Sequence, residues 1–334
     1  MSVYIIAEAG VNHNGSLETA KRLVDMAKEC GADAVKFQTF KAEESTGVKA
    51  LKAEYQQVND KTQESQFDMI KKLELPFEDF AVLKKYCAEK EIDFISTPDG
   101  LESLKCLLDI NVSRIKIGST EVTNAPFLKE IARCGKPVIL STGMSTLGEV
   151  EKAVDILQEN GVSGLELMHC TTDYPTEFED VNLRAMLTLS DAFKVPVGYS
   201  DHTPGFEAAV AATAMGAVVI EKHITLDRNM QGPDHRASMS PKDFAEYVRH
   251  IRNTELLLGD GRKKPTPKEK VMMQQVRRSV LAARDLKAGT VLDEDMLCVK
   301  RPGTGIAPDF IPIIKGRRLK RDIAMEEPIS WDDV

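Results

Sequence analysis

The sequence has little of what disulfide-bonded, membrane-spanning or nucleic-acid-binding proteins need. Six cysteines are scattered through 334 residues without a CxxC pair, which is typical of reduced thiols and argues against a structural zinc site. No apolar run approaches the roughly 20 residues of a membrane span, and the N-terminus lacks the basic segment of a signal peptide. A net charge of -8 opposes binding to nucleic-acid phosphates. We therefore expect a cytoplasmic protein that binds neither membrane nor nucleic acid.

Short β-rich runs alternate with amphipathic segments eight times along the chain. Such alternation favours a parallel sheet with intervening helices. The strands are predicted at Val3–Glu8, Ala34–Gln38, Asp93–Ser96, Arg114–Ile117, Pro137–Ser141, Leu165–His169, Pro196–Tyr199 and Val218–Lys222. Helices are predicted at Leu17–Cys30, Phe80–Glu91, Ala125–Cys134, Leu147–Asn160, Gly205–Met215 and Pro241–Leu258. Because open doubly wound sheets usually stop at about five or six strands, eight strands favour an α/β fold of the (β/α)8 TIM-barrel type.

Two segments interrupt the alternation. A connection of unusual length runs from about Thr39 to Glu78, and connections of that length in barrels are often functional, although a packed insertion is the alternative. A run rich in Gly, Pro and Lys follows the last barrel helix and is typical of a linker. We therefore expect a barrel over residues 1–258, a linker over 259–276 and a small domain of short strands and turns over 277–334.

Polar side chains gather where the predicted strands end, which is where the active site of an α/β barrel lies. Histidines give the clearest signal, because the chain has only six and four of them follow strands. His202 and His223 follow adjacent strands, so they could bind one divalent ion with water and substrate completing the shell. His13 and His169 are as consistent with hydrogen-bonded rim residues as with a site.

Lys36 and Lys116 lie on barrel strands, where an unpaired ammonium is costly. A bound phosphate or carboxylate would explain them, with the hydroxyls of Thr97, Ser119 and Ser200 as further donors. Two alternatives remain for these lysines: structural ion pairs with glutamates, and a Schiff base with a carbonyl substrate, for which Lys222 is also a candidate.

Glu8 and Glu221 point toward the same rim. A carboxylate there could relay protons or orient metal-bound water, or it could support a neighbouring lysine or histidine. Gly232–His235 (GPDH) forms a polar turn after the last strand.

The sequence resembles the bacterial N-acetylneuraminate (sialic acid) synthase family, which includes N,N'-diacetyllegionaminate synthases. The matching motifs are Ile6–Gly15 (IAEAGVNHNG), Val35–Phe40 (VKFQTF), Leu140–Met144 (LSTGM), Ser200–Thr203 (SDHT), Glu221–His223 (EKH) and Gly232–His235. Val299–Gly303 (VKRPG) resembles the SAF (antifreeze-like, β-clip) domain attached to those enzymes. The motifs occur in family order along nearly the whole chain.

The resemblance implies a metal-dependent condensation of phosphoenolpyruvate with an N-acetylated amino sugar. It implies a homodimer in which each SAF domain caps the partner's barrel, and a divalent ion, Mn2+ or in its place Mg2+ or Co2+, at His202 and His223. The catalytic residues it implies are Glu8, Lys116, Glu121 and Glu221. The substrate-binding residues it implies are Lys36, Gln38, Thr97, Ser119, Thr172, Tyr174, Ser200, Asp234 and, reaching the sugar N-acetyl group across the dimer, Arg301.

Three residues depart from the family pattern: Asp99 where phenylalanine is common, Thr120 where glycine is usual, and Thr172 where some members have asparagine. The motifs fit two sugar substrates, N-acetylmannosamine and 2,4-diacetamido-2,4,6-trideoxymannose. The competing functions are a Schiff-base aldolase on the same barrel, a non-catalytic sugar-binding homologue, and a synthase that uses a sugar phosphate.

Overall fold

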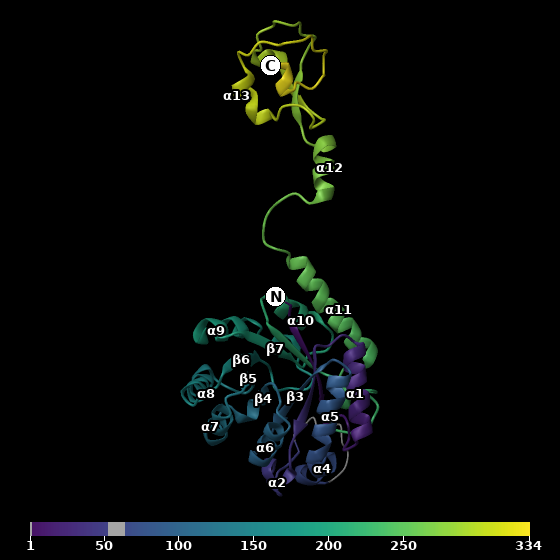
Figure 1. Ribbon diagram of the computed structural model, residues 1–334, viewed down its shortest axis with the longest axis vertical. Helices are drawn as coiled ribbons and strands as arrows, with labels where there is room; N and C mark the ends of the chain where they lie inside the picture. Colours follow the sequence, from purple (N-terminus) through teal and green to yellow (C-terminus); the bar gives the residue numbers. More distant parts are fainter. Residues whose placement is uncertain (1, 53–63) are drawn as a thin grey trace. The chain divides into compact units, whose positions relative to one another are not determined.

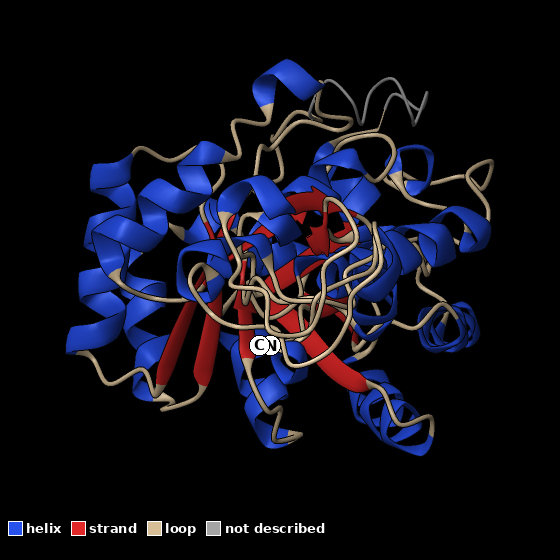
Figure 2. Cartoon of the chain, turned by 90° about the horizontal axis from the view of Figure 1, so that it is seen from above, coloured by secondary structure: helices blue, strands red, loops and turns tan. Residues whose placement is uncertain are grey.

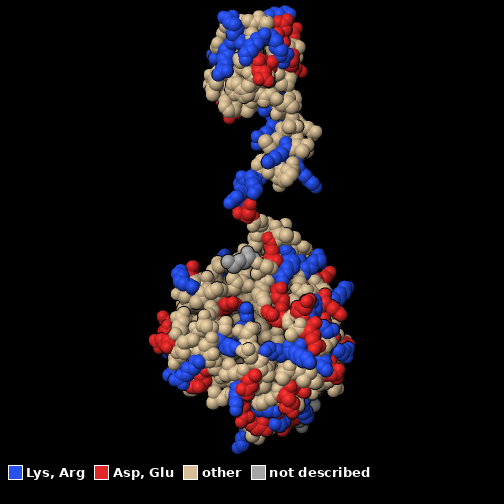
Figure 3. Space-filling view, in the orientation of Figure 1, with Lys and Arg blue, Asp and Glu red and all other residues tan. Residues whose placement is uncertain are grey.

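The computed structural model describes residues 2–52 and 64–334. The chain divides into two compact units, Met1–Gly259 and Asp260–Val334. In Figure 1 the first unit runs from purple to green, and the second from green to yellow. Acidic and basic side chains are interspersed over the face of the first unit in Figure 3. None of the described helices has both the length and the apolar character that crossing a bilayer requires.

Eight parallel strands form the centre of the first unit, and helices surround them (Figure 2). The strands are β1 (Tyr4–Gly10), β2 (Ala34–Thr39), β3 (Asp93–Pro98), β4 (Ile115–Ile117), β5 (Pro137–Ser141), β6 (Gly164–His169), β7 (Val197–Asp201) and β8 (Val219–His223). Strand β1 pairs with both β2 and β8, and β3 lies beside β4, so the sheet curls round on itself. The predicted (β/α)8 fold is confirmed.

The helices that surround the strands are α1 (Leu17–Glu29), α5 (Phe77–Glu89), α6 (Leu101–Asp109), α7 (Ala125–Arg133), α8 (Leu147–Glu159), α9 (Arg184–Phe193), α10 (Glu207–Ala214) and α11 (Pro241–Leu258). Side-chain hydrogen bonds cap the N-termini of several helices. At α1 the Ser16 hydroxyl accepts from the Thr19 amide, and at α8 Thr146 forms a reciprocal capping box with Glu149. Glycines in the left-handed region follow several ends, such as Gly31 with φ of 85° after α1.

Two apolar layers hold the barrel together. The larger lies between strands and helices and includes Leu23, Leu83 and Ile131. The smaller lies inside the barrel and is made of Ile6, Ala34, Ile95, Ile139, Met168 and Val219. Several of these inner residues precede a polar residue by two positions, as Ile6 precedes Glu8 and Ala34 precedes Lys36. Side chains two residues apart on a strand point to the same face, so these polar residues lie directly next to the inner apolar layer, on its carboxyl-end side.

The described part of the long connection after β2 carries helices α2 (Ala42–Ser45) and α4 (Gln66–Leu73). Residues 53–63 of this connection, including the run Ala53–Gln56 of the predicted functional loop, lie outside the described residues. Helix α4 packs through Leu73 and Ile70 against Val11 and Phe40, which follow β1 and β2. This part of the connection therefore lies over the carboxyl ends of the first two strands.

The second unit is a small domain with its own core. Helix α12 (Pro267–Val276) occupies the second half of the predicted linker, and Thr266 caps it in a capping box with Glu269. Strands β9 (Ser279–Ala282) and β10 (Leu297–Lys300) pair antiparallel, and a short helix α13 (Ile311–Ile314) follows. The core consists of Val280, Ala282, Leu286, Leu292, Ile306, Ile314, Leu319, Ile323, Ile329 and Val334.

Candidate active site

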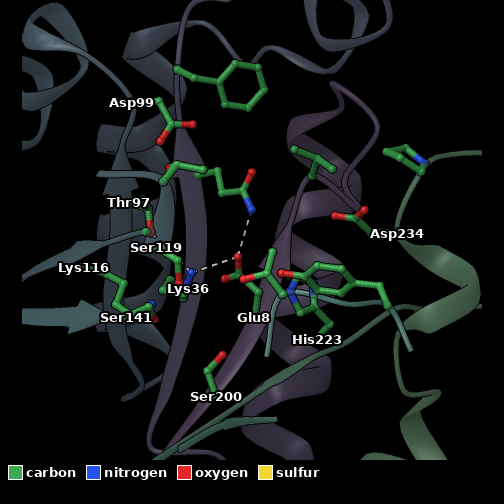
Figure 4. Close-up of a pocket in the computed structure, with 18 of the residues that line it drawn as sticks. Glu8, Lys36, Thr97, Asp99, Lys116, Ser119, Ser141, Ser200, His223 and Asp234 are labelled. Atoms are coloured by element: carbon green, nitrogen blue, oxygen red, sulfur yellow. Dashed lines mark hydrogen bonds and ion pairs between the residues drawn. The ribbon is translucent and has the colours of Figure 1, made fainter. Parts of the chain in front are cut away.

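A cavity opens at the carboxyl ends of the barrel strands, and most of the predicted site residues line it. The predicted residues found there are Glu8, Lys36, Gln38, Thr97, Lys116, Ser119, Thr172, Tyr174, Ser200, His202, Glu221, His223 and Asp234. The register of the strands brings several of them together: Glu8 is paired with Lys36 on one side and with His223 on the other. Figure 4 shows Lys36, Lys116 and Thr97 on one side of the cavity and His223 and Asp234 on the other.

Two lysines and two glutamates form a buried charge cluster at the bottom of this cavity. The Lys36 ammonium lies 2.9 Å from Glu8 Oε1 and 3.7 Å from Glu221 Oε2. The Lys116 ammonium lies 3.5 Å from the same Glu221 oxygen. All four side chains are at most 5% exposed. Because buried charges are costly without partners, the structural ion pairs considered above do form. They do not exclude an anion site, since both lysines still line the cavity.

The cluster shifts the protonation of its members in different directions. Burial alone would raise the pKa of Glu221, but Lys116 and Lys36 lower it to about 2. Burial raises the pKa of Glu8 above its ordinary value, against the attraction of Lys36. Burial lowers the pKa of Lys116, although the nearby Glu221 carboxylate acts to raise it. Glu221 is thus held ionised at neutral pH, whereas Glu8 is the more easily protonated of these two glutamates.

Hydroxyl groups extend the positive side of the cavity. Lys36 Nζ donates to Thr97 Oγ1 at 3.3 Å, and Lys116 Nζ donates to Ser141 Oγ at 2.7 Å. Ser119 Oγ accepts from the Gly143 amide at 2.9 Å, so its own hydrogen can turn elsewhere. Two ammonium groups with hydroxyls around them form a donor set suited to a phosphate or a carboxylate.

Two histidines occupy the opposite side of the cavity. The rings of His202 and His223 have centroids 5.6 Å apart, and the Tyr174 ring lies 4.2 Å from His202. Burial lowers the pKa of both imidazoles, so they are neutral at pH 7. His202 Nδ1 donates to the Thr171 carbonyl at 2.6 Å, which leaves the lone pair on Nε2. His223 Nδ1 is buried without a hydrogen-bond partner among the described residues.

These histidines fit a divalent ion. Two imidazoles on one ion, with metal–nitrogen distances of about 2.1 Å, have ring centres roughly 5 Å apart, close to the observed 5.6 Å. Within residues 2–52 and 64–334, no three His, Cys, Asp or Glu side chains group closely enough to hold a metal by themselves. Water and substrate would therefore have to complete the shell, as in an open catalytic site.

A network of hydrogen bonds holds the turn that carries Asp234. Asn14 Nδ2 donates to the Gln231 carbonyl at 2.8 Å, and Asn14 Oδ1 lies 3.1 Å from His235 Nε2. Asn12 Nδ2 donates to Ser238 Oγ at 2.8 Å, and that hydroxyl donates to the Asp234 carbonyl at 2.7 Å. The conspicuous NHNG segment after β1 thus positions the GPDH turn after β8.

Several other candidates lie away from the cavity. His13 accepts from the Gly15 amide and is fully buried, and His169 donates to the Val181 carbonyl; neither lines the cavity. Lys222 forms an ion pair of 3.1 Å with Asp201, and neither residue lines this cavity. The remaining two predicted site residues are Glu121 and Arg301.

Glu121 lies in a short 3-10 turn (Ser119–Glu121) and accepts a hydrogen bond of 2.6 Å from Asn124. It lines a second cavity, which adjoins the first through Ser45, Ile70, Asp99 and Thr120. Arg301 lies in the second unit and is exposed.

Sequence reasoning assigned no role to the apolar side of the cavity. This side consists of Val11, Phe40, Met69, Ile70, Leu73 and Met144. Sequence reasoning also gave no role to Ser141 and Cys170, which line the cavity. Ser141 ends one predicted strand and Cys170 directly follows another, and this position could have identified both. No such signal marked Ile70 and Leu73, because they are ordinary apolar residues on the core-facing side of helix α4.

Comparison with known proteins agrees with this geometry. Residues 23–263 match the NeuB family, and residues 277–334 match the SAF domain. The chain is 46% identical over 338 residues to N,N'-diacetyllegionaminic acid synthase of Legionella pneumophila, covering 100% of this chain and 95% of that protein. It is 46% identical over 329 residues to the protein of the same name from Campylobacter jejuni, covering 97% and 98%.

A crystal structure of N-acetylneuraminic acid (sialic acid) synthetase from Leptospira borgpetersenii superposes with a TM-score of 0.71 at 35% identity, covering 82% of this chain and 90% of that one. The resemblance inferred from the motifs is confirmed by these full-length matches. The chain belongs to the NeuB family and carries a SAF domain at its C-terminal end.

Proposed function

We propose that this enzyme condenses phosphoenolpyruvate with 2,4-diacetamido-2,4,6-trideoxymannose and water, giving N,N'-diacetyllegionaminate and phosphate. The observation that carries the proposal is the facing arrangement of the Lys36–Lys116 donors and the His202–His223 pair across one buried cavity. The choice of sugar rests on the 46% identity to two N,N'-diacetyllegionaminic acid synthases. N-acetylmannosamine, giving N-acetylneuraminate, is the second candidate, favoured by the 35% identity to a sialic acid synthetase.

In this scheme Lys36 and Lys116 bind the phosphate and carboxylate of phosphoenolpyruvate, with Thr97, Ser119 and Ser200 as further donors. The methylene carbon of phosphoenolpyruvate attacks the sugar aldehyde and forms the new carbon–carbon bond, while the aldehyde oxygen takes up a proton. Water adds to the adjacent carbon, and as the carbon–oxygen bond to phosphate breaks, the added hydroxyl becomes the keto group of the product. The two protons of the water end on the sugar oxygen and on the departing phosphate. Glu8 is the proposed acceptor of the water proton, because its Oε2 lacks a hydrogen-bond partner among the described residues.

A divalent ion, most simply Mn2+, would be held by His202 and His223. When bound, it would supply Lewis-acid polarisation of the sugar carbonyl. Tyr174, Gln38 and Asp234 also line this cavity and are proposed to bind sugar hydroxyl and acetamido groups.

Three features of the assembly are proposed from the family resemblance. The chain would form a homodimer, and each SAF domain would cap the barrel of the partner subunit. Arg301 would then reach the N-acetyl group of the sugar in the other subunit. A cytoplasmic location is proposed because phosphoenolpyruvate is a cytoplasmic metabolite and the cysteines are unpaired.

The direct test incubates the full chain and Mn2+ with phosphoenolpyruvate and each of the two sugars. We expect phosphate release that depends on the sugar, and a product whose mass equals sugar plus pyruvate. Borohydride reduction in the presence of pyruvate should trap no adduct on Lys36, Lys116 or Lys222. Lys36 and Lys116 are ion-paired with Glu8 and Glu221 within the cavity, and Lys222 is ion-paired with Asp201 away from it. A trapped lysine adduct would favour the aldolase, and absence of any turnover would favour a non-catalytic homologue.

The turn that carries Asp234 supplies a second prediction. Asn14→Ala removes two hydrogen bonds to that turn, each worth about 0.5–1.5 kcal/mol. We expect KM for the sugar to rise about tenfold while KM for phosphoenolpyruvate stays unchanged, because Asn14 acts on sugar binding only through Asp234. Asn160→Ala, which removes a comparable bond at the end of α8, is the control. Equal changes in both KM values would indicate a merely structural role for Asn14.

A further inference from the structure

The two strands that lead to the paired histidines carry a buried ion pair on their outer side. Strands β7 and β8 are paired in register as far as Asp201 and Lys222, which lie opposite each other. His202 and His223 come one residue later on each strand, so each member of the ion pair directly precedes one of the histidines. Successive side chains on a strand point to opposite faces, and Asp201 and Lys222 accordingly point away from the cavity that the histidines line.

The contacts of this ion pair are numerous and fully buried. Lys222 Nζ lies 3.1 Å from Asp201 Oδ2, and the two side chains are 2% and 0% exposed. The Tyr247 hydroxyl of helix α11 donates to the same oxygen at 3.0 Å, and the Tyr247 ring lies 5.5 Å from Lys222 Nζ. Asp201 Oδ1 accepts from the Thr203 amide at 2.9 Å and from the Thr203 hydroxyl at 2.7 Å. Lys222 Nζ also donates to the Thr203 carbonyl.

These contacts continue the connection between the two strands beyond the end of their ladder. The ladder between β7 and β8 ends at the Asp201–Lys222 pair, one residue before His202. On the other side of His202, Asp201 binds the amide of Thr203 and Lys222 binds its carbonyl. His223 still belongs to β8, which also pairs with β1. The ion pair therefore connects the segment that carries His202 to the strand that carries His223.

A buried ion pair adds little net stability, because the cost of desolvation offsets the attraction between the charges. Its hydrogen bonds nevertheless have fixed directions, so it can hold two backbone segments at one separation. Such a separation matters for a metal ion, since metal–nitrogen distances tolerate changes of only about 0.2 Å. His202 and His223 have no third His, Cys, Asp or Glu grouped with them among the described residues. Their spacing therefore has to come from the scaffold.

We propose that Asp201 and Lys222 are positioning residues, whose ion pair sets the spacing of His202 and His223 for one divalent ion. This inference rests on the proposed function, in which the two histidines hold that ion. Neither Asp201 nor Lys222 lines the cavity. Their removal should therefore change the affinity for the ion, with no direct effect on the binding of phosphoenolpyruvate.

The test is the double variant Asp201→Asn/Lys222→Met, which removes both charges together and leaves no buried charge without its partner. We expect the Kd for Mn2+, measured by equilibrium dialysis, to rise about tenfold to a hundredfold, as for other groups that orient metal ligands. At saturating Mn2+, kcat and KM for phosphoenolpyruvate should return to near the wild-type values. A general loosening of the barrel would not be corrected by Mn2+ in this way.

The matched control is the double variant Asp33→Asn/Arg252→Met. It removes another ion pair that involves a strand and its surroundings, with 2.6 Å between Arg252 of α11 and Asp33. Asp33 directly precedes β2, so this pair lies at the amino ends of the strands, opposite the histidines. The control may lose stability, but its Kd for Mn2+ should equal that of the wild type.

A milder variant keeps the test decisive where the double variant does not fold. Tyr247→Phe deletes only the hydroxyl that donates to Asp201, and we expect the Kd for Mn2+ to rise about threefold. Tyr86→Phe deletes a hydroxyl that donates to Asp25 at 2.9 Å, between α5 and α1, and should leave the Kd unchanged.

Two results would overturn the inference while leaving the metal site itself intact. One is a wild-type Kd for Mn2+ in the folded double variant or in Tyr247→Phe, and the other is an equal loss of affinity in the Asp33→Asn/Arg252→Met control. A wild-type chain that binds no Mn2+ would instead remove the metal site from the proposed function, and the inference with it.

Discussion

Replacing His202 or His223 by alanine is expected to lower the rate of phosphate release about a thousandfold. Each imidazole is neutral because burial lowers its pKa, and each has a ring nitrogen available for an ion. No third His, Cys, Asp or Glu in the described part of the chain joins them, so loss of one leaves too few protein ligands. Exhaustive chelation of the wild-type enzyme should have the same effect, and added Mn2+ should restore activity.

Measuring Mn2+ binding and secondary structure in the same variants shows whether a loss of activity comes from a lost metal ion or from unfolding. Equilibrium dialysis should find one Mn2+ per wild-type chain and much weaker binding in both variants, with unchanged far-UV circular dichroism. His250→Ala, which removes an imidazole stacked on Phe206 outside the barrel, should bind Mn2+ like the wild type. Activity that survives chelation, or normal Mn2+ binding by His202→Ala, would exclude the proposed metal site.

The sequence was sufficient to predict the eight strands to within about two residues, because the apolar β-rich runs are short and glycines mark the ends of helices. It also placed thirteen predicted site residues on one cavity, since strand ends in a barrel converge. Pairing of the charges was not predictable. Whether Lys36 faces Glu8 or an empty anion site depends on the register of β1 against β2, and a single sequence does not specify that register.

The role of α4 was hidden for a different reason. Ile70 and Leu73 follow the spacing of any amphipathic helix, and only the folded connection brings them over the ends of β1 and β2. Asp99 was noticed as a departure from the family, but its meaning depends on its neighbours. Burial and the nearby Glu121 raise its pKa to about 7, and neither influence is visible in a single sequence.

The second prediction with a large effect concerns Lys36→Met. This change removes the ammonium 2.9 Å from Glu8 and 3.7 Å from Glu221, leaving two buried carboxylates with only Lys116 nearby. Removing one partner of a buried pair costs about 3–5 kcal/mol, and we expect the free energy of unfolding at pH 7.5 to fall by about that amount. kcat/KM for phosphoenolpyruvate should fall at least about a hundredfold, because a charge-assisted contact to the substrate is lost as well.

The pH dependence of that destabilisation identifies its cause. Without Lys36 the pKa of Glu8, already raised by burial, rises further above its value in the unfolded chain. The folded state then binds more protons than the unfolded state, so its stability increases as the pH falls from neutral toward the unfolded pKa. Chemical denaturation should therefore show a smaller deficit at pH 5.5 than at pH 7.5.

Lys85→Met, which removes an exposed lysine 3.9 Å from Glu89, should leave both stability and kcat/KM near wild-type values. An equal deficit for Lys36→Met at pH 5.5 and 7.5 would mean that lost packing, not an unpaired carboxylate, destabilises the variant. The same buried charges would then be irrelevant to stability, and the case for Glu8 as a carboxylate that exchanges a proton during turnover would lose its electrostatic basis.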